Sequence, residues 1–385
     1  MIKIAVISVA RSDYSIIKPI LKILKNDKFF NLNFYVSGMH LDKRYGHTIK
    51  YIKKDNINIT QSIKTNSLGD DELSISKSIS LGVKKYSEIF HRNKPDLLLV
   101  TGDRFEMLAA VIAALPYNIV IAHIHGGELS LGAFDDSIRH AITKFSHIHF
   151  PSTDEYARRI MQLGEEKYRV KVVGAPALDN LKGINFKSFC QLNKEYGLSM
   201  NSSPIIVTYH TTTRHPYTIK KEMTNLLFVL EKVKFPIIFT APNADTNNHI
   251  IINMIKSFCK KNDNSYYLEN LGTINYYSFL SIAKMMLGNS SSGIIEGASF
   301  NLPVINVGDR QLGRASGVNV IHCKNSIYSI KKAINKALTK DFLISIKNVK
   351  NIYHKNGSSA KIVNYLKKLL RNNKTINKSF MDISI

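Results

Sequence analysis

Apolar, β-branched runs alternate with helical segments along most of this chain, and the alternation comes in two successive sets. The first set starts at Ile2–Val9 and closes with the stretch YRVKVVG, and the second starts at PIIVTYH. The strand-like runs are almost wholly apolar, as they are when helices cover both faces of a parallel sheet. This order is typical of doubly wound α/β folds. We therefore predict an α/β protein with two such domains in tandem and a cleft between them.

The expected boundaries follow from where the first set ends. Residues 1–175 form the first domain, and GAPALDNLKGINF (174–186) reads as a connector. Residues 176–370 form the second domain, with its last helix available to pack back on the first. Residues 371–385 are a polar tail that we expect to fray.

Charge points to nucleic acid at first sight, because 53 lysines and arginines against 29 acidic residues give a net charge of +24. The lysines, however, are scattered singly over helices among Asn and Ile, and no DNA- or RNA-binding motif is visible. We interpret them as solvated helix faces and expect no nucleic-acid partner.

Several other classes of protein are disfavoured by the sequence. The longest apolar runs, such as Leu97–Val100 and Ile119–Ala122, are too short to span a bilayer, so we expect no membrane partner. The first apolar run enters a polar, arginine-bearing turn, which favours a strand over a signal peptide. The three cysteines are widely spaced, without a CxxC pair or zinc-type spacing. A cytoplasmic protein is the expectation.

Polar residues gather directly after the predicted strands, where ligands of such sheets bind. These clusters are Arg11-Ser12-Asp13, Gly102-Asp103-Arg104, His123–Glu128, His210–Thr213 and Asn289–Ser292. The first of them lacks the GxGxxG of a dinucleotide fold, and no Walker A lysine loop occurs, so we expect no NAD and no other cofactor. Arg11 could still reach an anion.

The stretch GNSSSGIIE places three serines, Ser290, Ser291 and Ser292, between a strand and a helix. Unpaired amides at a helix start and serine hydroxyls suit a phosphate, although one serine could simply cap the helix. Glu296, on the first turns of that helix, can accept hydrogen bonds from ribose hydroxyls or can face solvent.

Four more side chains fit a nucleotide, each with a structural alternative. Arg310 and Arg314 can bind a diphosphate or fix loops through carboxylates. His210 can donate to a phosphate or hold its loop. Tyr276, beside Tyr277, can offer a flat surface to a nucleobase or belong to the core.

The densest group of titratable residues lies in IAHIHGGELSLGAFDDSIRH. It contains His123, His125, Glu128, Asp135, Asp136, Arg139 and His140. Such a group after an apolar strand is what proton transfer requires, and Asp103 lies at the end of the preceding strand. A capped helix would explain the aspartates but not HIHGGE. A metal site at His-x-His is disfavoured, because the carboxylates suit acid–base work around a neutral sugar.

Seven motifs, taken in their order along the chain, resemble the hydrolysing UDP-N-acetylglucosamine 2-epimerases. They are ARSDY, SGMHLDKRYGHTIKYI, GDRFE, HIHGGE, DDSIRHAITK, GNSSSGIIE and PVINVGDRQLGR. The resemblance covers about residues 1–370 and is closest to the bacterial sialic-acid branch. It implies a GT-B-like fold of two Rossmann-like domains. It also implies conversion of UDP-N-acetylglucosamine and water to N-acetylmannosamine and UDP, by elimination and then hydration, without metal or NAD, for sialic-acid synthesis.

The resemblance implies roles for the polar clusters. Candidates for proton transfer are Asp103, Glu128, Asp136, Asp135, His125 and His210. Candidates for substrate binding are Arg11, Asp13, Arg104, His210, Tyr276, Ser290, Ser291, Ser292, Glu296, Arg310 and Arg314. Some branches of the family have a catalytic glutamate where this chain has His125, so either Glu128 or His125 itself takes that role here.

Three alternatives remain open at this point. The same reaction could act on a UDP- or GDP-linked 2,4-diacetamido-2,4,6-trideoxyglucose, on the path to legionaminic-type acids. A GT-B glycosyltransferase would share the nucleotide half, and a polyanion-binding protein would use the positive charge. We expect a homodimer or homotetramer.

Overall fold

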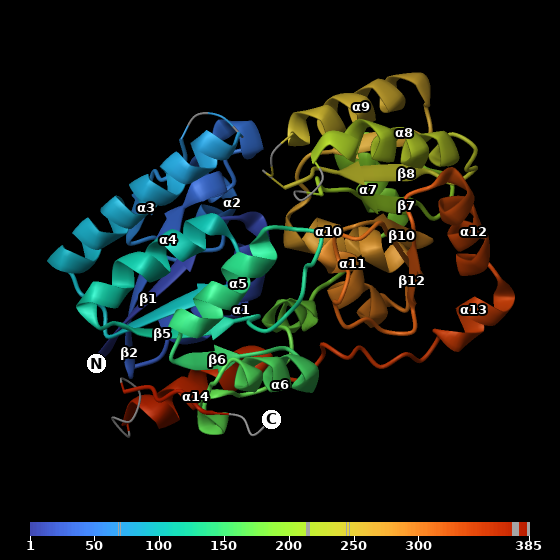
Figure 1. Ribbon diagram of the computed structural model, residues 1–385. Helices are drawn as coiled ribbons and strands as arrows, with labels where there is room; N and C mark the ends of the chain where they lie inside the picture. The colour runs from blue at the N-terminus through green and yellow to red at the C-terminus, as the bar shows by residue number, and fades with distance from the viewer. Residues whose placement is uncertain are drawn as a thin grey trace. The chain divides into compact units, whose positions relative to one another are not determined.

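The computed structural model describes residues 1–67, 69, 71–212, 216–243, 245, 247–371 and 377–382. Thr213, the last member of one predicted polar cluster, lies outside these residues. The chain divides into two compact units (Figure 1). Unit 1 contains Met1–Glu128, Asp135–Lys182 and Tyr353–Ile385, and unit 2 contains Leu129–Phe134 and Gly183–Ile352.

A six-stranded parallel sheet forms the centre of unit 1. Its strands, in the order β3-β2-β1-β4-β5-β6, pair without any antiparallel partner among the described residues. They are β1 (Ile2–Ser8), β2 (Phe30–Ser37), β3 (Gln61–Ile63), β4 (Leu97–Thr101), β5 (Val120–Ile124) and β6 (Ile148–Phe150). The order reverses between β1 and β4, which makes this edge the switch point of a doubly wound sheet.

Helices cover both faces of this sheet, as the apolar strands require. One face carries α1 (Arg11–Lys25), α2 (Ile49–Lys54) and α14 (Ser358–Arg371), whose apolar side chains share a core with alternate residues of β1. On the other face lie α3 (Glu72–Arg92), α4 (Phe105–Ala114) and α5 (Asp135–Phe145), packed in series (Figure 1). The remaining elements are α6 (Asp154–Gln162), η1 (Gly38–Leu41), η2 (Lys43–Tyr45), η3 (Leu115–Tyr117), η4 (Lys167–Arg169) and η5 (Pro176–Leu181).

Unit 2 repeats the same topology with different strands. Its parallel sheet has the order β12-β11-β10-β7-β8-β9, so the reversal falls between β7 and β10. The strands are β7 (Ile205–Thr208), β8 (Ile237–Thr240), β9 (Ser265–Leu268), β10 (Met285–Gly288), β11 (Val304–Val307) and β12 (Val320–Cys323). Both units are thus Rossmann-like, which confirms the predicted fold class.

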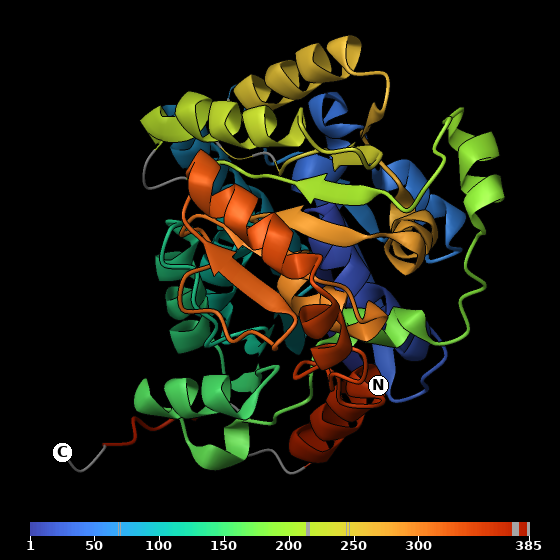
Figure 2. The ribbon, with the colours of Figure 1, turned by 90° about the vertical axis from the view of Figure 1, so that its right-hand side faces the viewer.

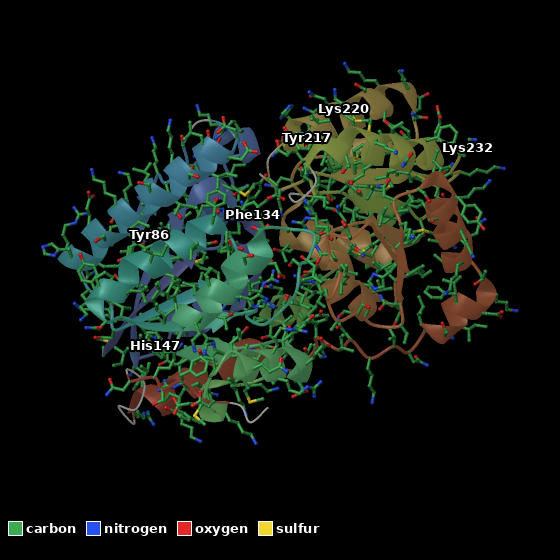
Figure 3. All side chains as sticks on the ribbon, viewed as in Figure 1. Tyr86, Phe134, His147, Tyr217, Lys220 and Lys232 are labelled. Atoms are coloured by element: carbon green, nitrogen blue, oxygen red, sulfur yellow. The ribbon has the colours of Figure 1, made fainter. Side chains whose placement is uncertain are left out.

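One face of the second sheet packs against α8 (Ile219–Leu230), α9 (Asn248–Lys261) and α12 (Ile327–Ala337), which Figure 2 shows beside the strands. The other helices are α7 (Phe189–Tyr196), α10 (Gly272–Ile282), α11 (Ser291–Glu296) and α13 (Lys340–Ser345), with η6 (Pro216–Thr218) and η7 (Gly297–Phe300). Lys220, in the first turn of α8, and Lys232, two residues beyond its end, are exposed (Figure 3).

Two segments differ from what the sequence suggests. YRVKVVG is not a strand of the ladder, because beyond β6 it makes only a single bridge between Val170 and His149 after η4. The polar tail does not fray throughout, because residues 377–382 contact unit 1 through Lys378, Phe380 and Met381. The last helix of the second predicted domain, α14, lies in unit 1, and residues 129–134 lie in unit 2.

Among the described residues, no helix has the length and apolar character needed to cross a membrane.

Gly288, the last residue of β10, fixes the spacing of strands at the switch point of unit 2. Its φ is +140°, and a Cβ placed there would lie 1.9 Å from the carbonyl oxygen of Thr208 on β7. An alanine would have to push the two strand ends apart in addition to adopting an unfavourable backbone conformation.

We therefore expect Gly288→Ala to lower the free energy of unfolding by about 3 kcal/mol or more, because backbone strain and overpacking add. Gly197, with φ +61° and nothing within 4 Å of an added Cβ, is the matched control. Gly197→Ala should cost about 1 kcal/mol. Urea unfolding of both variants measures the difference, and equal losses would contradict the close approach of β7 and β10.

Candidate active site

The loops that follow β7 and β10 are joined at the switch point of unit 2. The Asn289 side chain accepts a hydrogen bond from the His210 backbone N–H at 2.7 Å and donates one to the His210 carbonyl at 2.8 Å. The backbone N–H of Asn243 donates to Nδ1 of His210 at 2.9 Å. Since Nδ1 accepts, the neutral imidazole carries its proton on Nε2, which makes Nε2 a hydrogen-bond donor.

The three serines before α11 have three different environments. Ser290 is the N-cap and accepts from the backbone N–H of Ser292 at 3.4 Å, so the structural alternative holds for this serine. The hydroxyl of Ser292 donates to Glu296 and pairs with the hydroxyl of Tyr276. Among the described residues, only Ser291 of the three has no side-chain hydrogen bond, and it is half-buried.

Glu296 is buried and holds this cluster together. Its two oxygens accept from Ser292 and, at 2.9 Å, from the hydroxyl of Tyr277. Burial raises the pKa of the Glu296 carboxyl, and these two hydrogen bonds oppose the rise. Tyr277 is a core residue, whereas Tyr276 is half-buried beside it with ring centroids 6.0 Å apart.

The segment after β11 closes over the same switch point. Arg310 and Gln311 both donate to the carbonyl oxygen of Asn289, at 3.4 and 3.0 Å. Arg310 also forms an ion pair with Asp245 at 3.5 Å, and its Nε has no partner among the described residues. Arg314 donates to Ser130 at 3.5 Å. Both arginines therefore also hold loops. Sequence reasoning missed Gln311, which binds the same carbonyl as Arg310.

Several of the residues expected to transfer protons lie close together in unit 1, whereas His210 lies in unit 2. Asp103 follows β4 in a turn where Gly102 has φ +72°, and its carboxylate pairs with Arg139 of α5. Arg139 also donates to the backbone carbonyl of Glu128 at 2.9 Å. One guanidinium therefore links the end of β4, the loop after β5 and the start of α5, which carries Asp135 and Asp136.

His125 and Glu128 form a buried pair after β5. Nδ1 of His125 lies 2.6 Å from Oε1 of Glu128, which also accepts from Ser152 at 2.9 Å. His125 has φ +65°, a backbone conformation that non-glycine residues rarely adopt and that clusters at functional sites. Its Nε2 is buried and has no partner among the described residues. Ser152, which sequence reasoning missed, fixes the orientation of this pair.

The switch point of unit 1 contains a third group of buried charges. Asp13 on α1, Arg104 after β4 and Glu106 on α4 interact electrostatically, and Nε of Arg104 lies 3.2 Å from Oε2 of Glu106. Burial raises the pKa of Asp13 to about 6, with Arg104 opposing and Glu106 adding to the rise. Arg104 is itself buried, as is Glu106, whose role the sequence did not suggest.

Of the predicted residues, the structure places Asp103, Glu128, His125 and Asp136 in unit 1. Oδ2 of Asp136 lies 3.7 Å from Nε2 of His140. Asp13 and Arg104 form the neighbouring cluster, with Arg11 at the start of α1. His210, the serines, Glu296, Tyr276 and the two arginines gather in unit 2. Within the described parts of the chain, no group of three or more His, Cys, Asp or Glu side chains could hold a metal ion.

Two Rossmann-like units, each with its polar side chains at the carboxyl edge of a parallel sheet, define a class of GT-B-like nucleotide-sugar enzymes. Within that class, the chain matches the family described as UDP-N-acetylglucosamine 2-epimerase over residues 22–367. The chain belongs to this family.

Individual relatives agree with this assignment. The GDP/UDP-N,N'-diacetylbacillosamine 2-epimerase (hydrolyzing) of Campylobacter jejuni is 39% identical over 342 residues, 88% of each chain. The polysialic acid biosynthesis protein P7 of Escherichia coli is 33% identical and spans 100% of this chain and 98% of its own. The crystal structure of UDP-GlcNAc 2-epimerase from Neisseria meningitidis bound to UDP-GlcNAc superposes with a TM-score of 0.81 at 18% identity. It covers 95% of this chain and 100% of its own, and shows the same fold.

The raised pKa of Asp13 gives a pH-dependent prediction. Because the pKa lies near 6 in the folded state and near 4 in the unfolded state, ionised Asp13 disfavours folding, increasingly as the pH rises through this interval. We expect Asp13→Asn to raise the free energy of unfolding at pH 8 by about 2 kcal/mol relative to the native chain.

The gain should shrink to near zero at about pH 3, where the native carboxyl is mostly protonated in both states. Denaturant unfolding at both pH values measures it. A variant that is equally or less stable at pH 8 would contradict the buried, raised carboxyl. Asp154→Asn, at an exposed side chain, serves as the control.

Proposed function

We propose that this protein is a hydrolysing 2-epimerase of a nucleotide-linked 2-acetamido sugar. Family membership supports the class of reaction. The observation that carries the proposal is the separation of chemistry in the fold: buried acids and a histidine collect in unit 1, and donors suited to a diphosphate collect in unit 2. The reaction requires both kinds of group, acids and bases for the sugar and hydrogen-bond donors for the leaving diphosphate.

The reaction has two steps whose atoms balance. A base removes the proton from C2 of the sugar while the bond between C1 and the diphosphate oxygen breaks. This elimination leaves a C1=C2 double bond in a 2-acetamidoglucal, together with free nucleoside diphosphate. Water then adds its hydroxyl to C1. A proton enters C2 from the face opposite to the one that lost its proton, which inverts the configuration at C2. Each step needs one acid–base group on either face of the ring.

The groups of unit 1 suit these proton transfers. We assign Asp103 and the pair His125–Glu128 as the principal acid–base groups, with Asp136 and Asp135 as further candidates. The proposal is supported by the buried Nε2 of His125, which has no hydrogen-bond partner within the part of the chain that the structure describes, while Glu128 orients the ring from its other nitrogen. Arg139 forms an ion pair with Asp103 and so fixes the position of this carboxylate.

The groups of unit 2 suit a leaving nucleoside diphosphate. Several side chains there can donate hydrogen bonds to phosphate oxygens. They are His210 through its Nε2–H, the serines through their hydroxyls, and Arg310 and Arg314 through their guanidinium groups. Of the serines, Ser291 is the best candidate, because Ser290 and Ser292 already have internal partners. Glu296 would accept from the ribose and Tyr276 would face the base. Arg11 of unit 1 would add a further cation.

Two sugars are candidates for the substrate. The relative from Campylobacter jejuni bears the name of a 2-epimerase for diacetylbacillosamine, a 2,4-diacetamido-trideoxy sugar, and it is 39% identical to this chain. We therefore favour a UDP- or GDP-linked 2,4-diacetamido-2,4,6-trideoxyglucose. UDP-N-acetylglucosamine is the second candidate, which the name of the polysialic acid biosynthesis protein supports. The product would serve synthesis of a sialic-acid-type sugar.

We also propose a cytoplasmic enzyme that works as a homodimer or homotetramer. The three cysteines are all free, which suits a reducing compartment. Sedimentation equilibrium of the purified protein measures the oligomeric state.

Proton NMR in heavy water tests the reaction and the substrate together. Incubation with each of the two sugar nucleotides should release a free sugar with deuterium at C2, together with UDP or GDP. We expect turnover of the 2,4-diacetamido substrate to exceed that of UDP-N-acetylglucosamine at least tenfold in kcat/KM. Release of sugar without deuterium would exclude elimination, and transfer to an added acceptor sugar would indicate a GT-B glycosyltransferase instead.

A pair of variants separates the two groups of residues. Asp103→Asn should lower kcat at least a thousandfold while the Kd for UDP changes less than threefold, because the base is lost and the nucleotide contacts remain. Arg310→Ala should raise the Kd for UDP at least tenfold, since a charged hydrogen bond contributes about 1.5–3 kcal/mol.

Single-turnover kinetics and calorimetric titration with UDP measure the two effects. If Asp103→Asn weakens UDP binding and leaves the chemical step intact, its proton-transfer role is wrong. An unchanged Kd in Arg310→Ala would remove this arginine from the diphosphate site.

A further inference from the structure

The C-terminal tail makes a set of specific contacts with unit 1. Residues 377–382 follow α14 and lie beside the end of α6 (Figures 1 and 2). The backbone N–H of Met381 donates to the carbonyl of Gly164 at 3.0 Å, and Arg169 donates to the carbonyl of Asn377. The ring of Phe380 packs directly on Gly164, where an added Cβ would lie 2.7 Å from it. The tail thus has backbone, charged and aromatic contacts.

Lys378 is the centre of this set. Its ammonium group donates to Oε1 of Glu165 at 2.9 Å, to the carbonyl of Ser146 at 2.8 Å and to the carbonyl of Lys144. Glu165 is fully buried and also contacts Lys144 at 3.0 Å and His149 at 2.9 Å. Burial alone would raise the pKa of Glu165, but His149, Lys378 and Lys144 together lower it to about 2. The carboxylate is therefore charged, and Lys378 is one of its two ammonium partners.

The two carbonyls bound by Lys378 belong to the end of α5. This helix runs from Asp135 to Phe145, so Lys144 and Ser146 lie in its last turn and directly after it. Carbonyls at a helix C-terminus lack intrahelical partners and carry partial negative charge, which a cation stabilises. Lys378 therefore caps α5 from a part of the chain more than 230 residues away.

The other end of α5 carries the groups assigned to proton transfer. Asp135 and Asp136 form its first turn, and Arg139 binds both Asp103 and the carbonyl of Glu128. An α-helix of 11 residues behaves as a short rod, so fixing its last turn fixes the position of its first turn along the axis. The contact at Lys378 is thus transmitted to Asp103 and Glu128 through one helix.

We propose that residues 377–381 form a latch that positions α5, and through Arg139 the acid–base groups of unit 1, for proton transfer. The inference rests on the proposed function, because it takes Asp103, Glu128 and Asp136 as the acting groups. Lys378 is a positioning residue that acts through α5. The latch lies entirely in unit 1, so it should affect the chemical step and leave nucleotide affinity unchanged.

Two variants of the full protein and one control test the latch. Lys378→Met removes the cap and one partner of Glu165 but leaves Lys144 and His149 in place, so the variant should fold. A chain that stops after Arg371 removes the whole latch. Lys368→Met, at an exposed lysine of α14, changes the same charge in the same part of the chain. We expect kcat to fall about tenfold in Lys378→Met and further in the shortened chain, with the KM and the Kd for UDP within twofold of the native values.

Hydrogen–deuterium exchange gives a readout that does not depend on turnover. Amides of residues 135–146 should exchange at least tenfold faster in both latch variants, whereas amides of α8 in unit 2 should not change. Lys368→Met should match the native protein in both assays. Unchanged exchange in α5, or an equal loss of kcat and UDP affinity, would overturn the latch. A native protein without any turnover would count against the proposed function instead, and the exchange data would still decide whether the tail holds α5.

Discussion

The reversal of strand order in each sheet is the constraint on which the rest of the structure depends. Beside β1 and β4 in unit 1, and beside β7 and β10 in unit 2, the crossover helices leave in opposite directions. The carboxyl ends of these strands are therefore not covered by a helix of their own sheet, and polar side chains can collect there without leaving a core. Asp13, Asp103, His210 and Asn289 all follow one of these four strands. The strand order of each sheet therefore determines where polar side chains can collect.

At both edges, internal hydrogen bonds hold the polar side chains in place in advance of any ligand. Arg139 offsets the cost of the partly buried Asp103 carboxylate, and Ser152 and His125 share the Glu128 carboxylate. Glu296 is held in the same way by Ser292 and Tyr277. Such groups do not need to reorganise when charge develops in a reaction, which is the main source of electrostatic stabilisation in enzymes. The strained backbone of His125 fits this view, because its neighbours enforce a conformation that the residue would not adopt alone.

Local sequence patterns predicted the elements whose signal is local. The strand β1 ends one residue before its expected limit at Val9, because a continuous apolar run marks it. YRVKVVG has the same strand-like character, but it lies at the sheet edge beyond β6, where only one bridge forms. The helix α7 was missed, although Ser188 and Gln191 form a capping box and Gly197 ends it in a left-handed conformation. For the proposed site, single-sequence motifs named the carboxylates and serines as candidates. They could not identify Ser152 or Gln311, since these residues act through contacts with distant segments.

The tail and the loop after Glu128 show why such contacts decide the architecture of this protein. Lys378 reads as one more lysine in a polar end, and only the three acceptors around its ammonium group distinguish it from the exposed lysines of α8. Residues 129–134 likewise read as the continuation of HIHGGE, yet they pack within unit 2. There, a Cβ at Gly132 would lie 2.7 Å from Cα of Arg310, and Leu131 donates to the carbonyl of Leu312. Glu128 is therefore bonded directly to a segment that has no free space against Arg310. The backbone of Arg310 therefore packs against a segment that follows Glu128 directly in the sequence, which no local pattern around either residue indicates.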